Sequence, residues 1–151
     1  MVTSALPIIR RIESTKTRMR KKILLVDDDD SVVSYLAAKL SQRYDVVCTV
    51  QPRVAVAMAR AERPDLILCD IDMPGMSGGE VAAALAADAK TAAIPLIYLT
   101  ALVSPAEARE LQGLVSGRPA VAKRARMAEL IERIEHTVNA VQPPTAEPAG
   151  W

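Results

Sequence analysis

Five short apolar runs alternate with segments of helical spacing, and this alternation restricts the fold more than any other feature of the chain. The runs contain few polar residues, which is typical of strands that are buried on both faces. Strands of that kind occur in parallel sheets whose crossover connections are helices. The predicted strands cover Ile23–Val26, Val46–Val50, Leu66–Cys69, Ile94–Leu99 and Pro119–Ala122.

The intervening segments have the apolar spacing and the end signals of helices. The first places Val33, Leu36 and Leu40 on one face and has Ser31 as its predicted N-cap. Another is expected to begin at Ser104, because Ser104-Pro105-Ala106-Glu107 combines a capping box with proline at the first helical position. The remaining helices are expected over 54–61, 79–87 and 127–138.

Together these elements predict an α/β fold of the flavodoxin-like, doubly wound kind. It has a five-stranded parallel sheet with strand order 2-1-3-4-5 and helices on both faces. A length of 151 residues suits one such domain with short extensions. We expect a basic N-terminal extension over 1–21, the domain over 22–141 and a Pro-rich C-terminal tail over 142–151. Aromatic residues are only 3% of the chain, so an aromatic stacking platform for single-stranded nucleic acid is not expected.

The charges are distributed unevenly along the chain. Residues 1–22 contain seven basic residues and one acidic residue, whereas the remainder contains 12 basic and 17 acidic residues. A basic arm therefore precedes a mildly acidic domain. Such an arm suits contact with phosphate, lipid headgroups or an acidic partner, and the alternative is a solvated tail. We expect deletion of residues 1–20 to leave folding intact.

Two cysteines and the absence of a long apolar stretch bear on the compartment. Cys48 and Cys69 lie inside apolar runs and match no zinc or disulfide pattern, so we expect buried, reduced thiols in a cytoplasmic protein. No stretch approaches the roughly 20 apolar residues that span a membrane. The first residues do not resemble a signal peptide, because their basic residues follow the apolar patch.

Polar residues follow four of the predicted strands at the point where each strand ends. Asp27–Asp30 follow the first strand, Asp70 follows the third, Thr100 the fourth and Lys123 the fifth. In open α/β sheets, ligands bind beyond the carboxyl ends of the strands. We therefore expect these side chains to converge at one edge of the sheet, although an Asp run can also serve only as a turn and helix cap.

Converging carboxylates favour a divalent cation. Two carboxylates about 4 Å apart repel each other by roughly 4 kcal/mol at an effective dielectric near 20. A hard cation relieves that repulsion, and Mg²⁺ is the common choice where phosphate is also bound. Lys123 and Thr100 would contribute a positive charge and a hydroxyl donor, and Asp70 is placed to attack a phosphoryl group.

Three segments resemble the receiver domains of bacterial response regulators, the signal acceptors of two-component systems. The first is Lys22-Ile23-Leu24-Leu25-Val26-Asp27-Asp28-Asp29, which is similar to the opening of the family. The segment from Pro64 to Gly78 resembles the phosphoacceptor loop, and Pro95-Leu96-Ile97-Tyr98-Leu99-Thr100-Ala101 resembles the strand that ends in the switch threonine. The resemblance covers about residues 22–141.

The resemblance implies a role for each acidic residue at the strand ends. Asp70 would be the phosphoacceptor. Asp28 and Asp70 would bind Mg²⁺, Asp27 mostly through water, and Asp72 through its backbone carbonyl. The phosphoryl group would come from a histidine kinase or a phosphotransfer protein, as in a phosphorelay.

The resemblance also implies how the signal leaves the site. Lys123 would pair with the phosphoryl oxygens, and Thr100 would swing in to bond the phosphoryl group, which moves the surface of the fourth strand and the following helix. The output would be a shift between two conformations that an unknown downstream protein detects by contact. We expect a monomer or a phosphorylation-dependent dimer, and no enzymatic activity beyond the protein's own phosphorylation and dephosphorylation.

Two positions depart from the family pattern. The family usually has proline directly after the lysine, in a cis peptide bond, where this chain has Arg124. We expect a trans bond here, since a non-proline cis bond costs about 2.5–4 kcal/mol. The family's switch residue, usually Tyr or Phe, is Ala120. The usual aromatic readout therefore cannot operate in this chain as it does in the family.

Only about ten residues follow Val141, so we expect a stand-alone receiver with no DNA-binding domain. Two alternatives remain open. The first is a pseudo-receiver scaffold that phosphate does not switch, which Ala120 and Arg124 motivate. The second is a haloacid-dehalogenase-like phosphatase, because Asp70-Ile71-Asp72 resembles its nucleophile motif; in that family, however, the further acidic residues follow the lysine.

Overall fold

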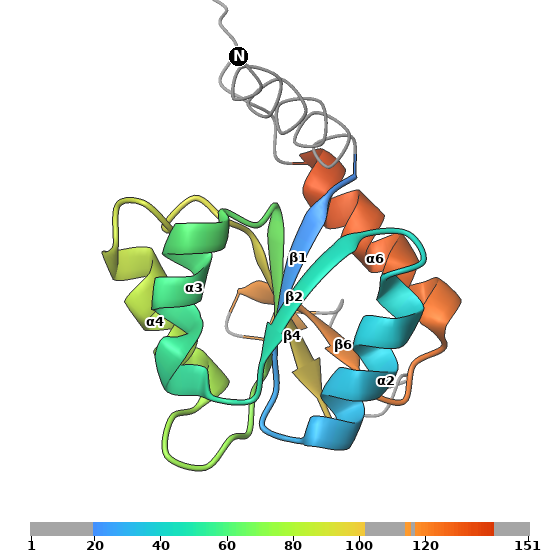
Figure 1. Cartoon of the computed structure of the whole chain (residues 1–151), viewed down its shortest axis with the longest axis horizontal. Coiled ribbons are helices and arrows are strands. Elements are labelled where there is room, and N and C mark those ends of the chain that lie inside the picture. The colour runs from blue at the N-terminus through green and yellow to red at the C-terminus, as the bar shows by residue number, and fades with distance from the viewer. Residues whose placement is uncertain (1–19, 102–113, 116, 141–151) are drawn as a thin grey trace, which may run out of the picture.

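The computed structural model describes residues 20–101, 114–115 and 117–140. Strands and helices alternate along these residues as the apolar pattern predicts (Figure 1). In chain order the elements are β1 (Lys22–Val26), α2 (Asp30–Leu40), β2 (Asp45–Thr49), the 3₁₀ helix η1 (Pro52–Val54), α3 (Ala55–Glu62), β3 (Leu66–Asp70), α4 (Gly78–Ala87), β4 (Leu96–Thr100), β5 (Leu114–Val115), β6 (Arg118–Ala122) and α6 (Met127–Ala140).

The strands form one sheet in the order β2-β1-β3-β4-β6-β5. The first five strands in this order are parallel, which confirms the predicted fold, with β6 as the predicted fifth strand. β5 was not predicted. It pairs antiparallel with β6 through Leu114 opposite Pro119 and Val115 opposite Arg118, and Gly117 adopts a φ of +78° in the connecting turn. A two-residue strand is too short to produce a recognisable apolar pattern.

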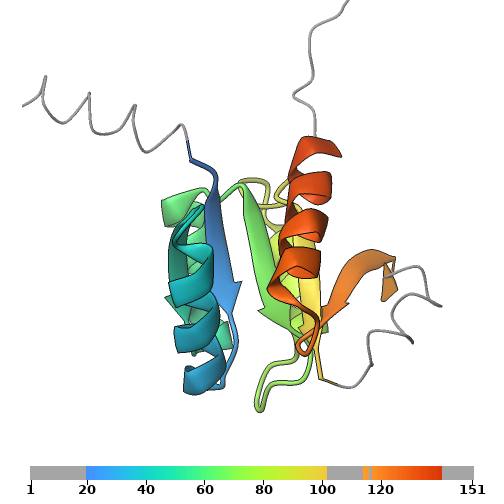
Figure 2. The same ribbon diagram turned by 90° about the vertical axis from the view of Figure 1, so that its right-hand side faces the viewer.

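Helices cover both faces of the sheet, with α2 and α6 on one face and α3 and α4 on the other (Figures 1 and 2). Successive residues of β1 enter opposite layers of the core. Ile23 and Leu25 belong to the cluster that contains residues of α2 and α6, whereas Leu24 and Val26 belong to the cluster with residues of α3 and α4. Each aliphatic side chain buried in this way contributes about 1.5–3 kcal/mol to folding. None of the helices within the described residues is long and apolar enough to cross a membrane.

The start of α2 differs from the prediction. The N-cap is Asp29, whose Oδ1 accepts hydrogen bonds from the backbone N–H of Ser31 at 3.0 Å and from its hydroxyl at 2.7 Å. The prediction of Ser31 as N-cap is therefore wrong by two residues. The carboxylate of Asp29, and not the hydroxyl of Ser31, accepts hydrogen bonds from the free N–H groups at the start of the helix. The helix expected from Ser104 lies outside the described residues.

The two cysteines differ in exposure. Cys69 on the central strand β3 is buried, as predicted. Cys48 is exposed, so the prediction that it is buried is wrong. β2 is an edge strand that pairs only with β1, and helices therefore do not enclose it as they enclose β3.

Candidate functional site

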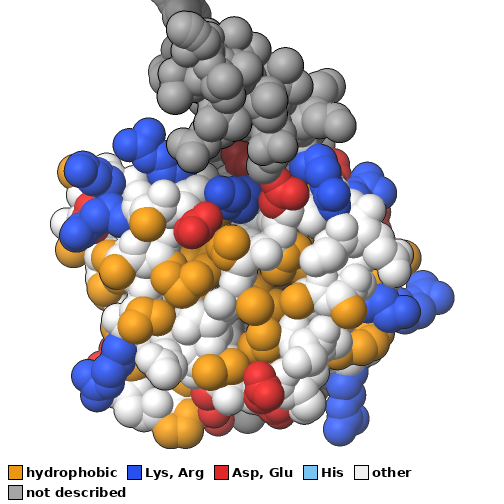
Figure 3. All heavy atoms as spheres, viewed as in Figure 1, with side chains coloured by type: hydrophobic (Ala, Val, Ile, Leu, Met, Phe, Trp, Pro, Cys, Tyr) orange, Lys and Arg blue, Asp and Glu red, His pale blue; other side chains and the backbone are white. Residues whose placement is uncertain are grey.

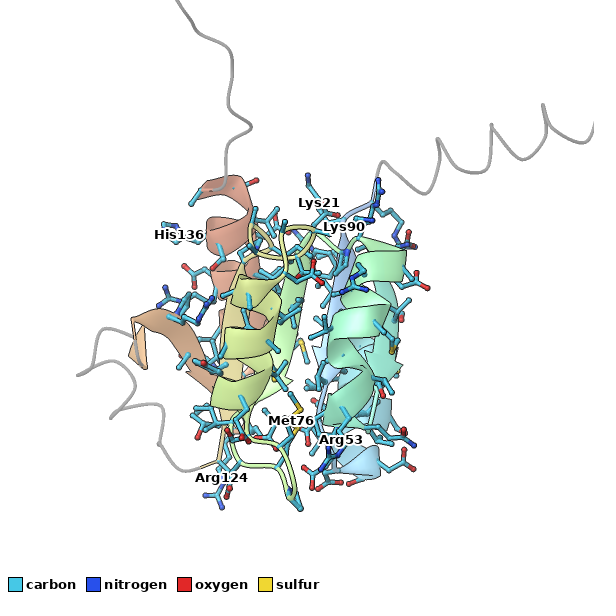
Figure 4. All side chains as sticks on the ribbon, turned by 90° about the vertical axis from the view of Figure 1, so that its left-hand side faces the viewer. Lys21, Arg53, Met76, Lys90, Arg124 and His136 are labelled. Carbon is cyan, nitrogen blue, oxygen red and sulfur yellow. The ribbon has the colours of Figure 1, made fainter. Side chains whose placement is uncertain are left out.

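The polar residues at the strand ends meet at one edge of the sheet because the four strands that carry or precede them are parallel. Asp27 directly follows β1, and Asp70 and Thr100 are the last residues of β3 and β4. Lys123 directly follows β6, and its backbone N–H donates to the carbonyl of Thr100 at 2.9 Å. In Figure 4 this edge is the lower end of the molecule, marked by the labelled side chains of Arg53, Met76 and Arg124.

Lys123 joins the two buried carboxylates of this edge. Its Nζ lies 2.8 Å from Oδ2 of Asp27 and 3.3 Å from Oδ1 of Asp70. The side chain of Asp27 is fully buried and that of Asp70 is 5% exposed, while the lysine keeps 18% of its surface accessible. A buried carboxylate needs such a partner, since an isolated charge in the interior is strongly unfavourable.

Asp28 adds a third carboxylate at the surface. One carboxylate oxygen each from Asp27, Asp28 and Asp70 lies within 4.8 Å of the other two. Three carboxylates and one ammonium group leave the cluster with an excess of negative charge. Oxygen donors of this kind fit Mg²⁺, and the exposed Asp28 leaves one side open to the water molecules that Mg²⁺ retains.

The environment of the cluster changes the proton affinity of two of its members. Burial, followed by the nearby charge of Asp27, raises the pKa of Asp70 to about 6, although Lys123 opposes this effect. Burial by itself disfavours the ammonium form of Lys123, but hydrogen bonding and attraction to Asp27 and Asp70 outweigh it and raise the pKa of the lysine. At neutral pH the lysine is therefore charged, and Asp70 is mostly a carboxylate.

Backbone groups hold the carboxylates in place. The N–H of Asp29 donates to Oδ1 of Asp27 at 2.9 Å, and the N–H of Asp72 donates to Oδ1 of Asp70 at 3.4 Å. The loop after β3 then folds back on itself, with the N–H of Gly78 donating to the carbonyl of Ile71 at 2.7 Å. A Cβ atom at position 78 would lie 2.3 Å from the carbonyl oxygen of Asp70, so this return path requires glycine.

The structure brings four of the predicted site residues into one cluster: Asp27, Asp28, Asp70 and Lys123. Thr100 is buried beside them, with 1% of its surface exposed, and its backbone carbonyl accepts a hydrogen bond from the N–H of Lys123.

The side chain of Asp72 is exposed and its carboxylate is not part of the cluster, while its amide contacts Asp70. That arrangement is compatible with a role for its backbone rather than for its side chain.

The two departures from the family pattern have structural counterparts. The described residues contain no cis peptide bond, so the bond between Lys123 and Arg124 is trans, as expected. Ala120 is buried and lies opposite Tyr98 of β4 in register. Both residues pack in the same apolar cluster, so the ring at this place of the sheet comes from β4 rather than from β6.

Sequence reasoning missed one basic residue at the rim of the site. Arg53 in η1 reaches over the loop that follows β3, since its Nη2 would lie 3.9 Å from a Cβ atom at Gly75 (Figure 4). The signal was available: Arg53 follows the end of β2, and the carboxyl ends of all parallel strands share one edge. The only histidine, His136, is exposed on α6.

Comparisons with known proteins identify the sequence family of the chain. The sequence model of the family "Response regulator receiver domain" matches residues 23–135. Response regulator PleD of Caulobacter vibrioides is 41% identical over 100 residues, which are 66% of this chain and 22% of PleD. Protein PilH of Pseudomonas aeruginosa is 40% identical over 80 residues, covering 52% of this chain and 66% of PilH. The matched region is thus a fifth of PleD, so PleD's whole activity does not transfer to this chain.

Solved structures give the same result for the fold. The crystal structure of a response regulator from Desulfuromonas acetoxidans has a TM-score of 0.68 at 27% identity, covering 81% of this chain and 99% of that one. Chemotaxis protein CheY4 of Vibrio cholerae has a TM-score of 0.67, also at 27% identity, covering 78% of this chain and 98% of CheY4. With the family model matching three quarters of its length, the chain belongs to the response regulator receiver domain family.

Proposed function

We propose that this chain accepts a phosphoryl group on Asp70 from a histidine kinase or a phosphotransfer protein, and that it signals to a downstream protein by contact. The observation that carries this proposal is the position of Lys123 between Asp27 and Asp70, with Asp28 exposed beside them. The cluster combines a buried carboxylate, a fixed cation and an open acidic face. These are the parts that phosphoryl transfer by positioning and charge neutralisation requires.

The contacts of Asp70 select the attacking atom. Among the described residues, both groups that contact its carboxylate, Lys123 Nζ and the N–H of Asp72, contact Oδ1. Oδ2 therefore attacks the phosphorus atom. The new bond joins Oδ2 to phosphorus, and the bond from phosphorus to the donor imidazole nitrogen breaks, with its electron pair returning to the imidazole. The product is an acyl phosphate.

Asp27, Asp28 and Asp70 would hold Mg²⁺, together with the backbone carbonyl of Asp72. The ion supplies positive charge to the phosphoryl oxygens when it is bound. Lys123 would supply a second positive charge to the phosphoryl oxygens. Since the lysine already contacts Oδ1 of Asp70, it needs little movement to reach an oxygen of the incoming group.

The output step differs from the family pattern in this proposal. The hydroxyl of Thr100 would bond the phosphoryl group and pull on the end of β4. Ala120 has no ring that could follow it, so the change must reach the partner through β4 itself and the segment after it. The downstream protein, and the choice between a monomer and a phosphorylation-dependent dimer, belong to this same proposal.

Incubation with Mg²⁺ and acetyl phosphate, followed by intact-mass measurement, tests the proposal. We expect one phosphoryl group per chain, stable in acid and labile in base, and none without Mg²⁺. Asp70→Asn should remove it. Asp30→Asn is the matched control, because Asp30 is an exposed carboxylate in the first turn of α2 and is not part of the cluster.

Absence of the adduct in the unmodified chain, together with failure to bind beryllofluoride, would contradict the proposal. That result would favour the pseudo-receiver alternative, in which the fold serves as a scaffold. An adduct that persists in Asp70→Asn would place the phosphoryl group on another residue.

A further inference from the structure

Asp29 joins the acidic cluster to helix α2 through every polar group that it has. Its backbone N–H donates to Oδ1 of Asp27 at 2.9 Å. Its carbonyl accepts a hydrogen bond from the N–H of Val33 at 3.1 Å, the first bond of the helix. Its carboxylate accepts from the N–H groups of Ser31 at 3.0 Å and Val32 at 3.4 Å. One residue is thus bonded to the cluster on one side and to the helix on the other.

The N–H of Asp29 helps to orient the buried carboxylate of Asp27. Oδ1 of Asp27 accepts this N–H, and Oδ2 lies 2.8 Å from Nζ of Lys123. A carboxylate that is held at both oxygens does not turn freely about its Cβ–Cγ bond, so its remaining lone pairs point in fixed directions. Displacement of the Asp29 N–H would release Oδ1 from its present direction.

Asp28, the exposed carboxylate of the cluster, lies between two anchored residues. Before it, the N–H of Asp27 donates to the carbonyl of Thr49 at 3.3 Å. After it, Asp29 is held by its hydrogen bonds to the start of α2. The backbone on both sides of Asp28 is therefore fixed, and this places a carboxylate oxygen within 4.8 Å of those of Asp27 and Asp70.

The metal that fits this cluster is sensitive to such placement. Mg²⁺ requires nearly ideal octahedral geometry at short distances, so small displacements of its ligands weaken binding. Groups that orient metal ligands without touching the metal typically change its affinity by about 10- to 100-fold when they are removed. In Figure 3 acidic side chains are visible at the lower end of the protein, the end at which α2 begins in Figure 1.

We propose that Asp29 is a positioning residue of the acidic cluster, which holds Asp27 and Asp28 in the arrangement that binds Mg²⁺ by capping α2. The inference rests on the proposed function for the use of the site, and it assigns a role to a residue outside the cluster. The carboxylate of Asp29 acts as the helix cap and not as a ligand. Any side chain that caps the helix should therefore serve in its place.

The Mg²⁺ affinities of Asp29→Ala and Asp29→Asn test this proposal in the full chain. Alanine has no group that caps a helix, whereas asparagine caps about as well as aspartate and has no charge. Isothermal titration calorimetry with Mg²⁺ gives the Kd of each variant. We expect the Kd to rise about tenfold in Asp29→Ala. Asp29→Asn and Asp29→Ser, a second uncharged cap, should recover most of that loss.

Asp30 provides the control for the loss of charge. It is an exposed carboxylate in the first turn of α2, outside the cluster, and it is not the N-cap. Asp30→Ala and Asp30→Asn should therefore have the same Kd as each other, and Asp29→Asn should match them. Equal values for Asp29→Ala and Asp29→Asn would show that only the charge of Asp29 matters and would overturn the proposal.

Arg20→Ala provides the control for the stability of the helix. The Nη2 of Arg20 donates to the carbonyls of Ser41 at 2.6 Å and Tyr44 at 2.8 Å, at the other end of α2. Its removal loosens the same helix far from the cluster, so the Kd for Mg²⁺ should stay unchanged. An equal rise of the Kd in Arg20→Ala and Asp29→Ala would mean that the stability of α2 alone governs Mg²⁺ binding, which contradicts a positioning role.

Two further measurements separate this inference from its alternatives. In the Mg²⁺-free protein, the amide of residue 29 should exchange its hydrogen faster in Asp29→Ala than in Asp29→Asn, since the cap holds that amide against Asp27. Labelling by acetyl phosphate is measured in parallel. If the unmodified chain binds Mg²⁺ but is not labelled, the proposed function fails, and the Mg²⁺ affinities still decide the role of Asp29. Failure of the unmodified chain to bind Mg²⁺ would overturn this inference.

Discussion

Lys123 lies closer to Asp27 than to Asp70: its Nζ is 2.8 Å from Oδ2 of Asp27 and 3.3 Å from Oδ1 of Asp70. Asp27 is the more deeply buried of the two carboxylates and is fully inaccessible. The lysine therefore has a structural role before any phosphoryl group arrives. It compensates the negative charge of Asp27, and its longer contact with Asp70 partly compensates the charge of that carboxylate as well.

Replacement of Lys123 by Met should destabilise the protein as well as impair phosphorylation. The change leaves the buried carboxylate of Asp27 without its cation, which costs about 3 kcal/mol for a buried pair that loses one partner. Urea denaturation at pH 7 measures the free energy of unfolding, and added Mg²⁺ should recover part of the loss. Arg124→Met is the control at a neighbouring exposed position and should change stability by less than about 0.5 kcal/mol. An equal effect of the two changes would refute the structural role.

Asp70 should make the Mg²⁺-free protein less stable as the pH rises. Its pKa is about 6 in the folded chain and 3.8 in the unfolded chain. Folding therefore favours the protonated form, and the stability this gives is complete below pH 4 and lost as the pH rises through 6. Asp70→Asn lacks this loss, so its advantage over the unmodified chain should grow between pH 4 and 7 by about 1–3 kcal/mol.

Urea denaturation of both proteins across this range, in the presence of a chelator, measures the difference. Taking the difference between the two proteins removes the contributions of the titrating groups that do not interact with Asp70. Addition of Mg²⁺ should shrink the advantage of Asp70→Asn at pH 7, because the ion stabilises the ionised cluster. A constant difference from pH 4 to pH 7 would show that the Asp70 carboxyl titrates like an exposed aspartate.

The alternation of apolar runs and helical segments was enough to predict the sheet order and the meeting of Asp27, Asp70 and Lys123 at one edge. It was not enough for features that depend on neighbours in space. Asp29 and Ser31 are both good N-caps, and the choice depends on the path of the chain as it leaves β1. The exposure of Cys48 follows from the position of β2 at the edge, which the predicted strand order already implied, and not from the apolar run around it.

The detailed contacts of the site were also beyond the sequence. Spacing indicated that Lys123 lies near the carboxylates, but the closer contact with Asp27 depends on the relative heights of β1, β3 and β6 in the sheet. The pairing of Tyr98 with Ala120 depends in the same way on the register of β4 with β6. Neither relationship has a signal in the apolar pattern, because that pattern does not encode register between distant strands.

Arg20 should mark the start of the stable domain. Its guanidinium donates to the carbonyls of Ser41 and Tyr44, next to the end of α2, where a cation is favourable. Removal of residues 1–19 should leave the free energy of unfolding unchanged, whereas removal of residues 1–20 should lower it by about 1 kcal/mol. Thermal and urea denaturation of the two truncated chains gives the comparison, and Arg20→Ala in the full chain should match the longer truncation. Equal stability of the two truncations would place the boundary after Arg20.

Gly78 should be far less tolerant of a side chain than its neighbour Gly79. A Cβ atom at position 78 would lie 2.3 Å from the carbonyl oxygen of Asp70 and 2.8 Å from Cα of Ile71, and both of these atoms belong to the backbone. Gly78→Ala must therefore push the loop away from the end of β3. We expect a loss of about 2–4 kcal/mol in stability, comparable to other forced overpacking of a buried site.

Gly79→Ala tests the same chemical change one residue later in α4. There the new Cβ atom would be 3.8 Å from the nearest atom, Oγ of Ser77, and alanine is the better helix former. Stability should rise by about 0.5–1 kcal/mol. Because the loop after β3 supplies the amide that holds Asp70, the labelling rate with acetyl phosphate should fall in Gly78→Ala and stay unchanged in Gly79→Ala. If Gly78→Ala is destabilised but is labelled as fast as the unmodified chain, the loop supports the fold without positioning the carboxylate.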